Sequence, residues 1–258
     1  IPDPVSGNVP KEMTKQDIVR LVEAYAAAAA RSRKAGFDGV QLHGAHGYGI
    51  NQFLSPAWNK RGDAYGGSPK KRYRFLAEVL EAVRGAVGDD LPVLIKLSVH
   101  DYYEGGLVPE EAVGIARRLA EDGIDAIEVS AGSAASFGGK VPARTKIRKE
   151  EDEGYLVELA AQVKEAVKVP VITVGGIRSL KTINDILTQG KADYVAMARP
   201  FIQEPDLIKR WKSGDTRRAA CISCNGCFET GLQGLGISCK VERKLREKGR
   251  KKKQQDDG

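Results

Sequence analysis

The stretch Gly36-Phe37-Asp38-Gly39-Val40-Gln41-Leu42-His43 contains a signature that occurs three times in the chain. A glycine that can end a helix is followed by an aspartate and then by a short apolar strand. The other copies are Gly123-Ile-Asp125-Ala-Ile127 and Gly190-Lys-Ala-Asp193-Tyr-Val195. Helix–loop–strand junctions repeated in this way are typical of an alternating β/α protein.

Working outward from this signature, five strand–helix units can be placed along the chain. We expect strands at 40–43, 92–98, 124–130, 170–176 (with its turn) and 194–200, and helices at 14–35, 68–87, 109–122, 150–167 and 179–190. Continuous apolar strands indicate burial on both faces, as in a parallel sheet. The fold class is therefore α/β, either a (β/α) barrel or an open doubly wound sheet. The Gly-x-Gly-x-x-Gly motif that marks a dinucleotide-binding fold does not open the chain, so that fold is the weaker interpretation.

Composition indicates a water-soluble globular protein of 258 residues, with 41% hydrophobic and 29% charged residues. We find no apolar run of about 20 residues and no signal peptide at Ile1, so we expect a cytoplasmic location. The net charge of +7 arises from residues 240–253, and the rest of the chain is balanced. We expect a disordered, solvated basic tail at 241–258, with nucleic-acid binding by the tail as a weaker alternative.

Two of the three histidines follow the first strand directly, in the sequence His43-Gly-Ala-His46-Gly-Tyr48. In parallel α/β proteins, chemistry occurs at the carboxyl ends of the strands. Neutral imidazoles and a phenol can hydrogen-bond a carbonyl oxygen, and the phenol can deliver a proton. The alternatives are a pair of structural histidines or a metal site, for which no third ligand is near. His100 has no partner motif, and we interpret it as structural.

Lys96 is a charge inside the otherwise apolar strand 92–98. A buried lysine without a partner is costly, so we expect this side chain to point into a ligand site. The alternative is a lysine that extends to the rim of the protein.

A glycine pair, Gly175-Gly176, follows the fourth strand and precedes a helix capped by Ser179. Glycines let backbone N–H groups approach an anion, and the helix adds its positive end. Ala198-Arg199 follows the next strand, and barrels often bind phosphate at their last two loops. We therefore predict a phosphate site here, with a simple turn as the alternative.

All four cysteines lie in one segment, as Cys221-x-x-Cys224-x-x-Cys227 and Cys239. Four thiolates with this spacing can hold an iron–sulfur cluster or, as a weaker alternative, zinc. Free or disulfide-bonded cysteines remain the other possibility.

The sequence LHGAHGYGINQFLSPAWNKRGDAYGGS at 42–68 resembles the old yellow enzyme family of FMN-dependent ene-reductases, and the resemblance extends to about Cys239. It implies a TIM barrel of which about five β/α units are present and the first three strands are missing. The missing part would come from a longer polypeptide, from another copy in a homo-oligomer, or from another chain. By the same resemblance, Arg61, Asp63 and Tyr65 shape the motif loop.

The resemblance also implies roles for the candidate residues. His43 and His46 would bind the oxygen of an α,β-unsaturated carbonyl substrate, and Tyr48 would protonate carbon after hydride transfer from the reduced flavin. Lys96 would meet the flavin N1/O2 edge. The phosphate of FMN would be held by Gly175, Gly176, Ala198 and Arg199, where the family usually has glycine at the position of Ala198.

The cysteine segment resembles the iron–sulfur branch of that family, which includes 2,4-dienoyl-CoA reductase and trimethylamine dehydrogenase. The implied [4Fe–4S] ligands are Cys221, Cys224, Cys227 and Cys239. We divide the chain into a linker at 1–13, an FMN-binding partial barrel at 14–215, a cysteine-cluster segment at 216–240 and the tail.

The predicted function is reduction of the C=C bond of an α,β-unsaturated carbonyl compound, an enone or enoyl substrate, by hydride from NAD(P)H through FMN. The alternative is a noncatalytic barrel fragment. Such a fragment would assemble with itself or a partner chain and bind flavin weakly or not at all.

Overall fold

The structure is a computed structural model in which residues 1–247 are described. The strands are β1 Val40–Gly44, β2 Val93–Ser98, β3 Ala126–Ser130, β4 Val171–Thr173 and β5 Tyr194–Val195. The main helices are α1 Lys15–Lys34, α2 Gly49–Leu54, α3 Pro69–Val87, α4 Pro109–Glu121, α5 Val157–Ala166 and α6 Leu180–Thr188. Three shorter helices follow, α7 Arg199–Gln203, α8 Leu207–Lys212 and α9 Cys227–Leu232. Two 3-10 turns, η1 Phe137–Gly139 and η2 Glu150–Asp152, lie after β3.

The five strands form one parallel sheet in the order β1-β2-β3-β4-β5. This arrangement confirms the α/β class, and consecutive parallel neighbours are the order of strands in a barrel. Within residues 1–247, β1 and β5 each pair on one side only, so the sheet has two open edges.

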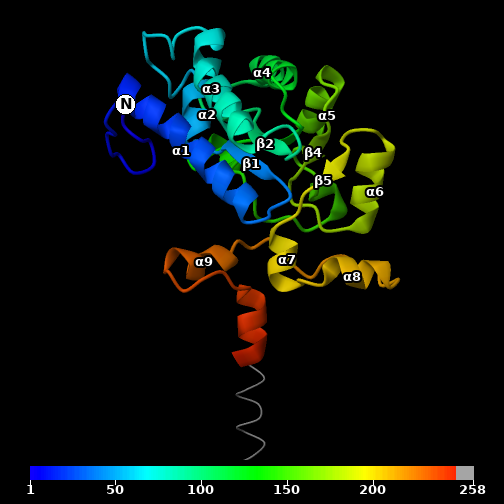
Figure 1. Cartoon of the computed structure of the whole chain (residues 1–258). Helices are drawn as coiled ribbons and strands as arrows, with labels where there is room; N and C mark the ends of the chain where they lie inside the picture. The colour runs from blue at the N-terminus through cyan, green and yellow to red at the C-terminus, as the bar shows by residue number, and fades with distance from the viewer. Residues whose placement is uncertain (248–258) are drawn as a thin grey trace, which may run out of the picture.

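The main core lies between one face of this sheet and the helices that connect its strands. Its largest fully buried side chains include Phe75 and Leu76 of α3, Ile95 of β2 and Ile127 of β3. In Figure 1 the helices form an arc around the strands, and α7, α8 and α9 lie outside this arc. The opposite face of the sheet is the inner face of the expected barrel, and below we call it the inner face.

Helix starts predicted from sequence are found with their expected caps. Thr14 and Asp17 form a capping box at α1, and the Ser179 side chain accepts from the Thr182 N–H at α6. Ser68 accepts from the Lys71 N–H just before Pro69, the first residue of α3.

The aspartates of the repeated signature clamp neighbouring strands together. The Asp125 Oδ2 atom, just before β3, accepts the Val93 N–H at the start of β2 at 2.7 Å. The Asp193 Oδ2 atom, just before β5, accepts the Val171 N–H at the start of β4 at 2.8 Å. Each carboxylate therefore ties the start of its own strand to the start of the preceding one. Asp38 occupies the same position before β1.

Two predicted elements are present but have the wrong bounds. The helix expected at 150–167 begins only at Val157, because Gly154 has a left-handed φ of 69° and its N–H donates to the Gly175 carbonyl oxygen at 2.7 Å. The strand expected at 194–200 ends at Val195, and α7 begins at Arg199 with Pro200 in its first turn, a position that suits proline in a helix.

The basic tail is only partly described. Residues 241–247 are helical, so the expectation of disorder does not hold for them, and 248–258 lie outside the described residues. Among residues 1–247, we find no helix whose length and apolar character would let it cross a membrane.

The motif loop offers a test of its packing. A Cβ atom at Gly66 would lie 2.2 Å from the Arg61 carbonyl oxygen, whereas one at Gly62 would meet nothing within 4 Å. Because overpacking costs about 1–3 kcal/mol, Gly66→Ala should lower the free energy of unfolding by that amount. Gly62→Ala, the matched control, should change it by less than about 0.5 kcal/mol. Urea titration of the two variants measures both values, and equal effects would contradict the described loop.

Candidate active site

The structure brings the three predicted catalytic side chains together at the carboxyl end of β1. The His43 and His46 rings have centroids 5.1 Å apart, and the His43 and Tyr48 rings are 5.4 Å apart. His43 is the fourth residue of β1, and Tyr48 immediately precedes α2. Tyr48 is 62% exposed, so its ring borders solvent, whereas His46 is largely buried.

The position of His46 is fixed by two serines that the sequence reasoning did not single out. The His46 backbone N–H donates to the Ser98 Oγ atom at 3.1 Å, and the ring Nε2 atom of His46 is 2.7 Å from the Ser130 Oγ atom. Its backbone has a left-handed φ of 66°, which is uncommon for a residue other than glycine. Because β2 and β3 end in these serines, pairing of the strands places His46.

Both histidines favour the neutral form. Burial lowers the pKa of His46 to about 4, and the nearby His43 and Lys96 add to this effect. Burial, followed by the charge of Lys96, also lowers the pKa of His43, while Glu128 opposes the shift. Neutral imidazoles can donate hydrogen bonds to a ligand oxygen at neutral pH without adding positive charge.

Lys96 points to the inner face and has an acidic partner there. Its Nζ atom forms an ion pair with Glu128 of β3, whose other carboxylate oxygen accepts from the Gln41 Nε2 atom at 2.9 Å. Sequence reasoning missed Glu128, although the argument used for Lys96, a charge inside an apolar strand, applies to it equally.

The glycine pair after β4 forms a tight turn. Gly175 and Gly176 have φ values of 141° and 71°, and a Cβ atom at Gly176 would lie 3.0 Å from the Tyr155 ring. The buried Glu153 carboxylate accepts the N–H groups of Arg178 and Ser179 at 2.8 and 3.0 Å. These two amides at the start of α6 are thus already used.

Arg199 follows β5 and lies beside the cysteine segment. Its guanidinium donates to the Arg144 carbonyl oxygen at 2.8 Å and to the Asn225 Oδ1 atom at 2.6 Å. Because β5 pairs with β4, Ala198 and Arg199 lie at the same rim as the glycine turn.

The cysteine segment brings its four cysteines around one small hollow. The four cysteines are free, and together with Arg199 they line one small hollow. Ser223 and Asn225, between the first three cysteines, have left-handed φ values of 53° and 58°. The Gly226 N–H lies 3.4 Å from the Cys224 Sγ atom. Within residues 1–247, no three His, Cys, Asp or Glu side chains are placed to hold a single metal ion.

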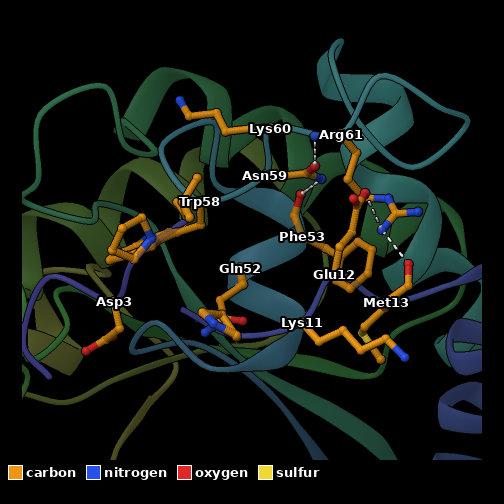
Figure 2. A pocket seen from close by; sticks show the side chains of 13 residues that line it. Asp3, Lys11, Glu12, Met13, Gln52, Phe53, Trp58, Asn59, Lys60 and Arg61 are labelled. Carbon is orange, nitrogen blue, oxygen red and sulfur yellow. Dashed lines mark hydrogen bonds and ion pairs between the residues drawn. The ribbon is translucent and has the colours of Figure 1, made fainter. Parts of the chain in front are cut away.

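Hydrogen bonds hold the rest of the motif loop to itself and to the N-terminal segment. Figure 2 shows Arg61 donating to the Met13 carbonyl oxygen, at 2.8 Å, and the Asn59 amide donating to the Phe53 carbonyl oxygen, at 2.7 Å. These side chains border a cavity of about 290 Å³ that also includes Trp58. None of the predicted catalytic or cofactor-binding residues lines it.

His100 has a local structural role. Its Nδ1 atom accepts the Tyr102 N–H at 3.1 Å, and the two rings stack at a centroid distance of 4.0 Å.

The lowered pKa of His46 predicts an acid-dependent loss of stability. In the unfolded chain His46 is protonated below the ordinary histidine pKa of about 6.5, whereas in the folded protein it stays neutral down to about pH 4. Stability should therefore fall as the pH drops from 6.5 to 4. Asparagine tolerates the left-handed backbone and does not titrate. Over this window the Tm of His46→Asn should therefore fall by about 2–4 °C less than the Tm of the wild type. Parallel Tm–pH curves for the two proteins would refute this effect.

Comparison with known proteins gives consistent results. The family model described as NADH:flavin oxidoreductase / NADH oxidase matches residues 4–217. The chain is 39% identical to a NADH oxidase of Thermoanaerobacter brockii over 93% of this chain and 37% of the relative. It is 43% identical to an NADPH dehydrogenase of Clostridium acetobutylicum over 79% of this chain and 57% of the relative.

Among solved structures, a 2-naphthoyl-CoA reductase complex superposes with a TM-score of 0.85 at 32% identity, over 93% of this chain and 36% of that one. The chain thus spans between about a third and somewhat over half of the length of these relatives. These partial matches agree with part of a TIM barrel. The chain belongs to the NADH:flavin oxidoreductase / NADH oxidase family, the old yellow enzyme family whose motif it carries.

Proposed function

We propose that this chain forms part of an FMN-dependent reductase that uses NAD(P)H to reduce the C=C bond of an α,β-unsaturated carbonyl compound. The observation that carries the proposal is the cluster of His43, His46 and Tyr48 at one strand end, with both imidazoles biased toward the neutral form. Family membership supports the flavin-dependent class of reaction.

The residues at the rim of the sheet fit FMN. Gly175 and Gly176 present backbone in conformations that side chains rarely allow, and a Cβ atom at Gly176 would crowd Tyr155. The amides of this turn and of Ala198–Arg199, with the Arg199 guanidinium, would hold the phosphate. Lys96 would lie at the N1/O2 edge of the ring. FMN held there would supply the redox chemistry that carries hydride from NAD(P)H to the substrate.

The chain's own residues then supply binding and a proton. The neutral rings of His43 and His46 donate hydrogen bonds to the substrate carbonyl oxygen and withdraw electron density from its conjugated double bond. Tyr48, next to His43, delivers a proton from its hydroxyl group to the carbon that does not receive hydride.

We further propose that the cysteine segment holds a [4Fe–4S] cluster through Cys221, Cys224, Cys227 and Cys239. The curled loop and the Gly226 N–H near the Cys224 sulfur support this, because amides commonly hydrogen-bond cluster thiolates. Cluster ligands bind different iron atoms and stand further apart than the ligands of one zinc ion. Iron with acid-labile sulfide would identify a cluster, whereas zinc alone would identify a single-ion site.

The open edges at β1 and β5 support a second component that closes the barrel. Another copy in a homo-oligomer, a partner chain or a further part of a longer polypeptide could supply the missing strands. The exposure of Tyr48 favours the alternative function, a noncatalytic fragment, if no such component is present.

The proposed reaction is tested with Tyr48→Phe, using 2-cyclohexenone with NADH and NADPH. Loss of the proton donor should lower kcat at least about 100-fold, while FMN content and flavin reduction by NAD(P)H stay unchanged. The matched control is Tyr103→Phe, whose ring stacks on Trp58. Wild-type activity retained in Tyr48→Phe would remove Tyr48 from the mechanism, and a flavin-free, inactive wild type would favour the noncatalytic alternative.

The cluster proposal predicts iron and acid-labile sulfide in anaerobically purified protein. Cys224→Ala should lose most of both, because one ligand is removed, whereas the control Ser238→Ala should keep them. Elemental analysis would contradict the proposal if zinc, or no metal, accompanied the four cysteines.

A further inference from the structure

A charged row crosses the inner face of the sheet. His43, Lys96 and Glu128 are register partners on β1, β2 and β3. Residues aligned in this way point to the same face of a sheet. Glu128 interrupts a strand whose every residue is buried, Ala126–Ser130. An acid in such a strand requires a partner, and the register provides it.

Glu128 compensates the charge of Lys96 directly. The Glu128 side chain is 9% exposed and the Lys96 side chain 22% exposed, and their ion pair is shielded from solvent. In such surroundings the attraction is screened much less than at the surface. The Gln41 Nε2 atom on β1, 2.9 Å from the second carboxylate oxygen, orients Glu128 from the other side of β2.

We propose that Glu128 is a positioning residue that fixes the Lys96 ammonium on the inner face and sets how much positive charge reaches the flavin edge and His43. The proposal rests on the FMN site described under the proposed function. With Glu128 ionised, the pair is close to neutral, and without it Lys96 would present a full positive charge.

The direction of each effect follows from charge. Reduction gives the flavin negative charge near N1, so removing the Glu128 charge should favour the reduced form. The same removal should disfavour the His43 imidazolium. The charged groups that act on His43 are Lys96 and Glu128, and its other titratable neighbours are His46 and Tyr48.

The first measurement needs no flavin. The chain has three histidines, so NMR can follow each of them in a pH titration. In Glu128→Gln the pKa of His43 should fall, while that of His100 should stay in place. Gln41→Lys, on the edge strand, should shift His43 the same way without altering the buried strand. The control Glu158→Gln removes an exposed carboxylate paired with Lys191 and should move no histidine. An unchanged or raised His43 pKa in both test variants would overturn the proposal.

The second measurement uses protein reconstituted with FMN. In Glu128→Gln the equilibrium between oxidised and reduced flavin should shift about tenfold toward reduction, or about 30 mV in midpoint potential for a two-electron couple. Glu128→Asp keeps the charge and should stay close to wild type. An unchanged potential in Glu128→Gln would refute the effect on flavin. If the wild type binds no FMN, the proposed function fails, and the His43 titration alone decides the role of Glu128.

Discussion

Parallel pairing of consecutive strands is the constraint on which the whole site depends. Since each strand runs in the same direction, each one ends at the same rim, where its last residues or the following loop contribute to the site. His43, Lys96 and Ser130 come from three strands in this way, and the Gly175 turn follows the fourth. The aspartate clamps Asp125 and Asp193 act at the opposite ends of these strands.

The electrostatics of the rim favour weak, directional donors over free charge. Burial keeps His46 neutral, and the cation of Lys96 is offset by a carboxylate on the next strand. Such a site can orient a polar but uncharged group with little competition from ordinary anions. At the far end of the sheet the Arg199 guanidinium donates to a backbone carbonyl oxygen and to the Asn225 side chain beside the cysteine segment.

Much of this could be predicted from local sequence, because local chemistry determines it. Capping residues fix where α1, α3 and α6 begin, and the glycine–aspartate signature fixes where strands start. The errors arise where distant contacts decide. The break at Gly154 depends on the Gly175 carbonyl oxygen, and the importance of Glu128 depends on register with Lys96. Neither contact can be inferred from a pattern along the sequence. The two histidines and Tyr48, in contrast, belong to the one motif at 42–68 and could be predicted together.

Asp38 stands before β1 as Asp125 and Asp193 stand before β3 and β5, yet within residues 1–247 no strand pairs with β1 on the side that Asp38 would clamp. Any strand that joins there in parallel meets a carboxylate suited to its first N–H. If the pairing register of that strand shifted by one residue, the carboxylate would face the wrong amide, and the side chains of the strand would point to the other face of the sheet. Asp38 therefore gives the open edge at β1 one carboxylate that can set the register of a parallel strand pairing there.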